Sequence, residues 1–135
     1  MTDSSNKNLI DKLGVKPGAR LIVLRAPAGY MDLLEGVEEH AKVATRLGVR
    51  RFDFIQYFAT SVEQLGAVIP NLALHLEPNG TLWVSWAKRS SRLHTGLTDS
   101  IVRELGIKTG LVDVKVASIT DDWSGLKFVY RVAER

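Results

Sequence analysis

Cysteine is absent from this sequence of 135 residues. Its absence excludes disulfide bonds, a thiolate nucleophile and metal centres held by cysteine, and it is typical of proteins in a reducing compartment. No apolar run approaches the ~20 residues of a membrane-spanning helix, and the polar segment of residues 1–6 lacks the apolar core of a signal peptide. We therefore expect a cytoplasmic protein with no membrane partner.

The chain also has little excess of charge of one sign. Its 18 basic and 15 acidic residues leave a net charge of only +3. Hydrophobic residues make up 45% of the chain, with 11 glycines and 4 prolines, a composition typical of a globular domain. A chain of this length holds one hydrophobic core. We expect a polar tail and short helix in residues 1–14, followed by a single domain in residues 15–135.

The hydrophobic pattern predicts alternating strands and helices. Strands are expected over residues 20–25, 52–59, 81–86, 112–116 and 126–132, and helices over residues 8–13, 30–35, 61–76 and 99–105. Residues 37–51 fit either a helix over 38–47 or a short outer strand over 41–45, and we choose the strand.

Local signals place the ends of the third helix. Thr60 precedes Glu63 by three residues, a capping-box spacing that predicts a helix starting at Ser61. Pro70 is expected to kink or split this helix, because proline removes a backbone hydrogen bond. The turn at residues 78–80 is expected to end it.

This order of elements predicts an α/β fold: a three-layer, Rossmann-like domain with a mostly parallel sheet of about six strands and a C-terminal antiparallel hairpin. Ligands bind such sheets at the carboxyl ends of the parallel strands. The loops there carry the candidate ligand-binding residues Arg25, Gly29, Tyr30, Thr60, Ser61, Trp86, Lys88, Arg89, Ser90 and Arg92. The basic members suit a phosphate, nucleotide or carboxylate, and ordinary solvated surface charge is the competing interpretation.

Signals for catalysis and metal binding are few. His40, His75 and His94 lie far apart in the sequence and none has the spacing of a metal ligand. No nucleophile elbow, phosphate-binding loop or zinc-protease pattern occurs. We therefore predict no catalytic residue and no metal. Trp123 is expected to cap the edge of the sheet, with a binding platform as the alternative.

Two resemblances add to this pattern. Residues 16–24, 52–55 and 76–82 resemble the fold of S-adenosylmethionine-dependent methyltransferases, over residues 15–132. Residues 26–30, 83–88, 111–115 and 123–127 resemble a family of small bacterial proteins described only as a domain of unknown function. Both imply a methyltransferase-like topology, and the second implies no established activity.

The chain departs from the methyltransferase pattern at two places. The turn over residues 25–29 has one glycine and a proline where that family has a glycine-rich turn, and Thr45 and Arg46 stand where an acidic residue holds the ribose. We therefore expect no cofactor and disfavour S-adenosylmethionine. The residues favour a non-catalytic, methyltransferase-like module that binds a protein partner or an anionic small molecule.

Two alternatives stay open. One is a divergent S-adenosylmethionine-dependent methyltransferase whose cleft uses Tyr30, Thr60 and Trp86. The other, which we disfavour, is weak binding of nucleic acid through the basic loop of residues 88–92.

Overall fold

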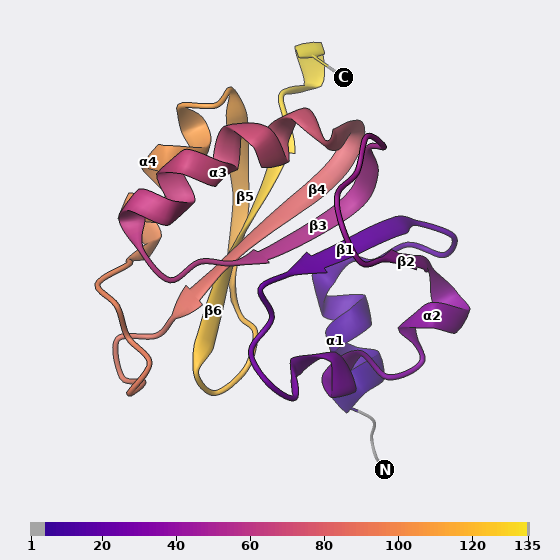
Figure 1. Cartoon of the computed structure of the whole chain (residues 1–135), viewed down its shortest axis with the longest axis horizontal. Coiled ribbons are helices and arrows are strands. Elements are labelled where there is room, and N and C mark those ends of the chain that lie inside the picture. Colours follow the sequence, from indigo (N-terminus) through magenta and orange to yellow (C-terminus); the bar gives the residue numbers. More distant parts are fainter. Residues whose placement is uncertain (1–4, 135) are drawn as a thin grey trace.

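The computed structural model describes residues 5–134 and shows a six-stranded sheet with helices on both faces (Figure 1). The first half of the chain forms α1 (Ser5–Leu13), β1 (Arg20–Leu24), the 3₁₀ helix η1 (Tyr30–Leu34), α2 (Val37–His40), β2 (Lys42–Ala44) and β3 (Phe52–Phe58). The second half forms α3 (Val62–Leu74), β4 (Leu76–Ala87), α4 (Asp99–Ile107), β5 (Leu111–Ser118), β6 (Trp123–Tyr130) and the 3₁₀ helix η2 (Val132–Glu134). None of the helices in this described part is long and apolar enough to cross a membrane.

The strands lie in the order β2-β1-β3-β4-β6-β5. The first four of these strands are parallel to one another, whereas β6 runs antiparallel to both β4 and β5. The predicted α/β class, the mostly parallel sheet and the C-terminal hairpin are therefore confirmed. The hairpin folds back so that its second strand, β6, lies next to β4.

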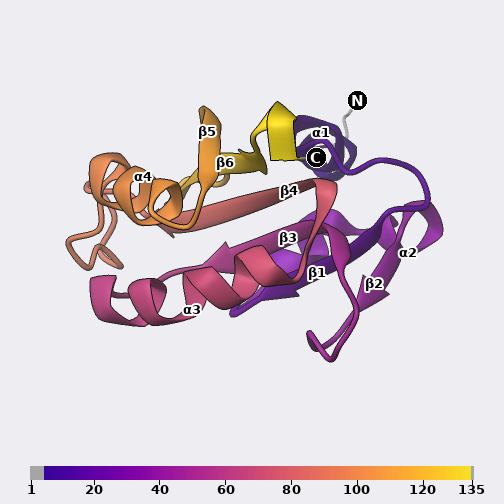
Figure 2. The same cartoon turned by 90° about the horizontal axis from the view of Figure 1, so that it is seen from above.

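Each face of the sheet has its own hydrophobic core. In Figure 1 α3 lies in front of the sheet and α1 behind it, and Figure 2 shows the same two layers from above. Alternating side chains of β3 divide between the cores: Ile55 packs on the α3 side and Phe54 on the α1 side. Trp83 and Trp86 of β4 divide in the same way, because side chains three residues apart on a strand point to opposite faces.

The first helix belongs to this domain. Leu9, Ile10 and Leu13 of α1 are buried in the core that also contains Trp83. The indole nitrogen of Trp83 donates a hydrogen bond of 2.9 Å to the carbonyl oxygen of Leu13. The short helix expected before residue 15 therefore packs against the same sheet as the rest of the chain, and the division expected at residue 15 stays a prediction. Residues 1–4 of the expected polar tail lie outside the described residues.

The ambiguous stretch after η1 contains both kinds of structure. The short helix α2 precedes β2, which pairs in parallel with β1. The strand that we chose over the long helix is therefore present, shortened to three residues. The helix expected over residues 30–35 is a 3₁₀ helix.

The helix cap lies one residue later than the Thr60–Glu63 spacing predicted. Ser61 is the N-cap of α3, and its hydroxyl accepts a hydrogen bond of 3.1 Å from the Gln64 amide. Thr60 instead donates through its hydroxyl to the side-chain oxygen of Gln64, at 2.8 Å. The helix also continues through Pro70, so the expected split does not occur.

The start of β4 differs more from expectation. The strand begins at Leu76, which pairs with Phe52, whereas Thr81 pairs with Phe54. Residues 77–80 therefore form a bulge inside the strand rather than the turn expected before it. Gly80 is required there, because a Cβ at this position would lie 2.9 Å from the backbone oxygen of Asp53.

Candidate functional site

The turn after β1 has an unusual backbone. Arg25 follows the last residue of β1 with a φ of 59°, and it is the only described residue other than glycine with a positive φ. This left-handed conformation favours glycine and costs other residues on the order of 1–3 kcal/mol, a strain that concentrates at functional sites. The turn therefore has a glycine-like backbone at a residue that carries a charged side chain.

A shallow depression of about 510 Å³, broadly open to solvent, lies beside this turn. Its lining residues are Leu24, Arg25, Leu47, Tyr57, Gln64, Ala67, Val68 and Asn71, and we name it the Arg25 cavity. Leu24 and Tyr57 pair across β1 and β3 near the carboxyl ends of both strands. Residues 64, 67, 68 and 71 of α3 form one wall, because this spacing places them on a single helical face.

The polar groups of the Arg25 cavity are one cation, a phenol and two amides. The ion pairs among the described residues all involve Arg103, so the guanidinium of Arg25 has no carboxylate partner there. Burial raises the pKa of the Tyr57 phenol, and the charge of Arg25 partly opposes this rise. Tyr57 is therefore protonated at neutral pH and can donate a hydrogen bond. This set suits a ligand with a carboxylate, hydroxyl groups and an apolar part.

Two other candidates, Gly29 and Tyr30, lie on a second cavity of about 300 Å³, together with Trp123. The Tyr30 side chain is 2% exposed, and its hydroxyl bonds to Gln56 rather than facing a ligand. Trp123 packs edge-on against Phe58 with ring centroids 5.1 Å apart. This packing favours the cap interpretation of Trp123 over the platform.

Trp86, Lys88 and Arg89 lie on a third cavity, of about 240 Å³, beyond the end of β4. The Lys88 ammonium group donates a hydrogen bond of 2.6 Å to the Ser118 hydroxyl. The Arg25 cavity contains no residue of the basic loop of residues 88–92, and the third cavity does not contain Arg25. Arg25 and the basic loop therefore share none of the cavities described above. As ligand-binding residues, Arg25 and the basic residues of this loop stay predictions.

The remaining candidates lie on loops or in a helix cap. Ser90 and Arg92 belong to the connection after β4 and line none of the three cavities described above. The hydroxyls of Thr60 and Ser61 are both engaged with Gln64 at the start of α3. These four residues also stay predictions as ligand contacts.

The sequence did not identify most of the Arg25 cavity. Leu47, Tyr57 and the face of α3 were assigned to ordinary structure, because their approach to Arg25 depends on long-range packing. One available signal was the pair of amide residues Gln64 and Asn71, which lie seven residues apart on a helix with an apolar opposite face.

No protein-family model matches the chain, and no curated protein matches its sequence. The resemblance to the small bacterial family therefore stays a prediction. Solved structures do match. A SAM-dependent methyltransferase from Aquifex aeolicus aligns with a TM-score of 0.69 at 14% identity, over 91% of this chain and 88% of that one.

Two further structures show the same likeness. A TehB-like SAM-dependent methyltransferase from Corynebacterium glutamicum aligns with a TM-score of 0.59 at 13% identity, covering 96% of this chain and 89% of that one. A magnesium protoporphyrin IX methyltransferase from Synechocystis, solved with bound SAM, aligns with a TM-score of 0.61 at 14% identity, covering 96% and 77%.

These neighbours correct one expectation. We expected no cofactor, and this expectation is contradicted because the chain is similar to methyltransferases that include a complex with SAM. At these identities the likeness establishes the architecture alone. The protein has the fold of the S-adenosylmethionine-dependent methyltransferases.

Proposed function

We propose that the protein is a divergent S-adenosylmethionine-dependent methyltransferase that holds its cofactor in the Arg25 cavity. The observation that carries this proposal is the position of the cavity. It lies at the carboxyl ends of β1 and β3, beside the left-handed turn at Arg25. Ligands of open α/β sheets bind at this edge, and the depression there has a volume of about 510 Å³ and is open to solvent, so a small ligand can enter it.

The residues of the Arg25 cavity fit the parts of S-adenosylmethionine. The guanidinium of Arg25 would pair with the carboxylate of the methionine part through charge-assisted hydrogen bonds. Leu47 and Val68 supply an apolar surface for the adenine. The ring of Tyr57 provides a π face that attracts a cation such as the sulfonium. When bound, S-adenosylmethionine supplies a methyl group that is activated by the sulfonium charge.

The side-chain amides of Gln64 and Asn71 would bind the ribose hydroxyls in place of the acidic residue that this chain lacks. The sequence has Thr45 and Arg46 where related enzymes have an acidic residue for the ribose hydroxyls. Gln64 and Asn71 both line the Arg25 cavity, from the adjacent helix α3. An amide can accept and donate hydrogen bonds to hydroxyl groups, so α3 would replace the end of β2 as the ribose-binding element.

This proposal takes the place of the non-catalytic module that the sequence favoured. The solved structures with the same architecture include several methyltransferases, which supports the enzymatic alternative better than a binding module. The sequence-based methyltransferase alternative used Tyr30 as a cleft residue, whereas the structure shows that Tyr30 is buried. The Arg25 cavity supplies Tyr57 and Gln64 in its place.

Isothermal titration calorimetry with S-adenosylmethionine and S-adenosylhomocysteine tests the proposal. We expect both to bind, and we expect Arg25→Met to weaken binding by about 10-fold or more, because a hydrogen bond to a charged group contributes about 1.5–3 kcal/mol. Arg131→Met is the matched control, since Arg131 is exposed and follows the opposite end of the sheet. Absence of binding, or equal binding by the two variants, would overturn the proposal.

A further inference from the structure

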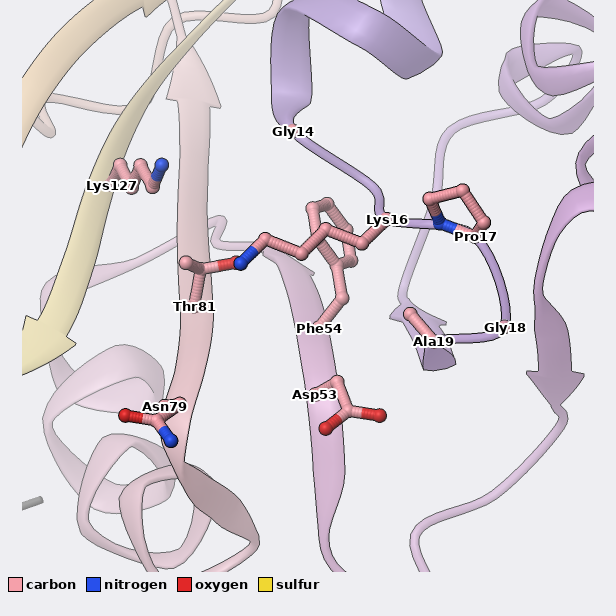
Figure 3. A pocket seen from close by; sticks show the side chains of 10 residues that line it. All are labelled: Gly14, Lys16, Pro17, Gly18, Ala19, Asp53, Phe54, Asn79, Thr81 and Lys127. Carbon is pink, nitrogen blue, oxygen red and sulfur yellow. The ribbon is translucent and has the colours of Figure 1, made fainter.

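A further cavity lies at the opposite edge of the sheet, near the amino ends of β1 and β3. It has a volume of about 410 Å³. Figure 3 shows its lining residues: Gly14, Lys16, Pro17, Gly18, Ala19, Asp53, Phe54, Asn79, Thr81 and Lys127. They come from the loop between α1 and β1, the start of β3, the bulged part of β4, and β6. We name this the Lys16 cavity, and neither the sequence nor the proposed function assigns it a role.

One end of the Lys16 cavity gathers positive charge. Lys16 extends across the cavity toward Thr81, and Lys127 lies on the neighbouring strand (Figure 3). The pKa of Lys127 is lowered by burial first, and then by the charges of Lys115 and Lys16. The ion pairs in the described part of the chain all involve Arg103, so none of these lysines has a carboxylate counter-ion there. An anion bound between Lys16 and Lys127 would relieve this repulsion.

The other end of the Lys16 cavity is polar and includes a carboxylate. Asp53 accepts a hydrogen bond of 2.9 Å from the backbone amide of Arg20 through one oxygen, Oδ2. Asn79 lies near Asp53 on the bulge of β4 (Figure 3). A carboxylate accepts hydrogen bonds from hydroxyl groups and repels a second anionic group. The cavity is therefore polarised, with an anion-binding end and a hydroxyl-binding end.

We propose that the Lys16 cavity binds a small phosphate monoester that carries hydroxyl groups, such as a sugar phosphate. The phosphate would lie between Lys16 and Lys127, and the hydroxyls would lie toward Asp53 and Asn79. The volume of about 410 Å³ suits a small organic ligand rather than an inorganic ion. The site is independent of the Arg25 cavity, since S-adenosylmethionine carries no phosphate and the two cavities share no residue.

Titrations with ribose 5-phosphate, ribose and inorganic phosphate, followed by calorimetry, test this proposal. We expect ribose 5-phosphate to bind most tightly, inorganic phosphate at least tenfold more weakly, and ribose not measurably. Lys16→Met and Lys127→Met should each weaken binding of ribose 5-phosphate at least tenfold. The control Lys108→Met, at the exposed end of α4, should leave binding unchanged. Arg25→Met should also leave it unchanged, which separates this site from the proposed function.

Two further measurements keep the test decisive. Lys127→Met should raise the melting temperature of the free protein, because it removes a partly buried charge repelled by Lys115 and Lys16, so loss of binding in this variant would not reflect misfolding. Asp53→Asn should reduce the ratio of the affinity for ribose 5-phosphate to the affinity for inorganic phosphate. Equal binding by Lys127→Met and Lys108→Met would overturn the proposal. Tighter, salt-sensitive binding of a single-stranded oligonucleotide would overturn it in favour of a nucleic-acid surface.

Discussion

The hydroxyl of Tyr30 donates a hydrogen bond of 2.7 Å to the side-chain oxygen of Gln56, which joins η1 to the centre of the sheet. Gln56 in turn donates to the hydroxyl of Ser85 on β4, at 3.3 Å. Gln56 and Ser85 are the only fully buried polar side chains in the described part of the chain. This network ties the segment that follows the Arg25 turn to β3 and β4.

Tyr30→Phe should lower the free energy of unfolding by about 1–3 kcal/mol, because it leaves the oxygen of Gln56 buried without a donor. Chemical denaturation at neutral pH measures the change. The double variant with Tyr30→Phe and Gln56→Leu should lose less free energy of unfolding than the two single variants lose together. In the double variant both partners of the hydrogen bond are removed, so neither is left buried without the other. Strict additivity of the two substitutions would contradict the coupling.

Alkaline pH should destabilise the protein partly through Tyr30. Burial raises the pKa of this phenol well above its usual value near 10, so the folded state keeps a proton that the unfolded chain loses. Stability is therefore unaffected by this group below pH ~10 and falls as the pH rises above it. The fall between pH 9.5 and 11 should be smaller in Tyr30→Phe than in the wild type. An identical fall in both proteins would contradict the shift.

The two neighbouring hydroxyls at the start of α3 should differ in their effect on stability. Ser61→Ala removes the acceptor of the Gln64 amide and should cost about 0.5–2 kcal/mol, the usual effect of losing an N-cap. Thr60→Ala removes only an exposed hydrogen bond to the Gln64 side chain and should cost less than about 0.5 kcal/mol. Thermal unfolding of both variants measures the two losses of stability. A larger loss for Thr60→Ala than for Ser61→Ala would indicate that Thr60, and not Ser61, caps α3.

Glycines on the two long helices of the front layer offer a matched pair. A Cβ at Gly106 of α4 would lie 2.2 Å from the ring of Phe128, whereas one at Gly66 of α3 would find its nearest neighbour at 3.8 Å. Gly106→Ala should therefore destabilise the fold by about 1–3 kcal/mol through overpacking. Gly66→Ala should stabilise it by up to about 1 kcal/mol through helix propensity. Equal melting temperatures for the two variants would contradict this packing.

The fold was predictable where local pattern and tertiary packing agree. The apolar run at residues 20–24 forms β1, in which Leu21 and Ile22 are fully buried. Residues 112–116 also form a strand, although Val114 and Val116 are exposed at the edge of the sheet, so this strand depends on its pairing with β6. The start of β4 was missed because Pro78 and Gly80 are typical of turns. Here they form a bulge that pairing with Phe52 holds inside the sheet. The cap was missed because Thr60–Glu63 and Ser61–Gln64 both have capping spacing.

The candidate site was predictable only in its general position. The rule for open α/β sheets indicates the edge at which the Arg25 cavity lies, and Arg25 was among the residues named there, although its role as a ligand contact stays a prediction. Its left-handed backbone could not be inferred, since arginine rarely adopts that conformation. The approach of Tyr57 and the α3 face depends on the pairing of β1 with β3, and no local sequence signal encodes it.

The most direct test of the proposed function is a titration of the ¹⁵N-labelled protein with S-adenosylmethionine, followed residue by residue by NMR. The account predicts saturable shifts at the amides of Leu24, Arg25, Leu47, Gln64 and Val68, which belong to the Arg25 cavity. It predicts no saturable shift at Gly18 or Lys127, which line the opposite edge. An unchanged spectrum at millimolar S-adenosylmethionine, or shifts confined to the Lys16 cavity, would contradict the account.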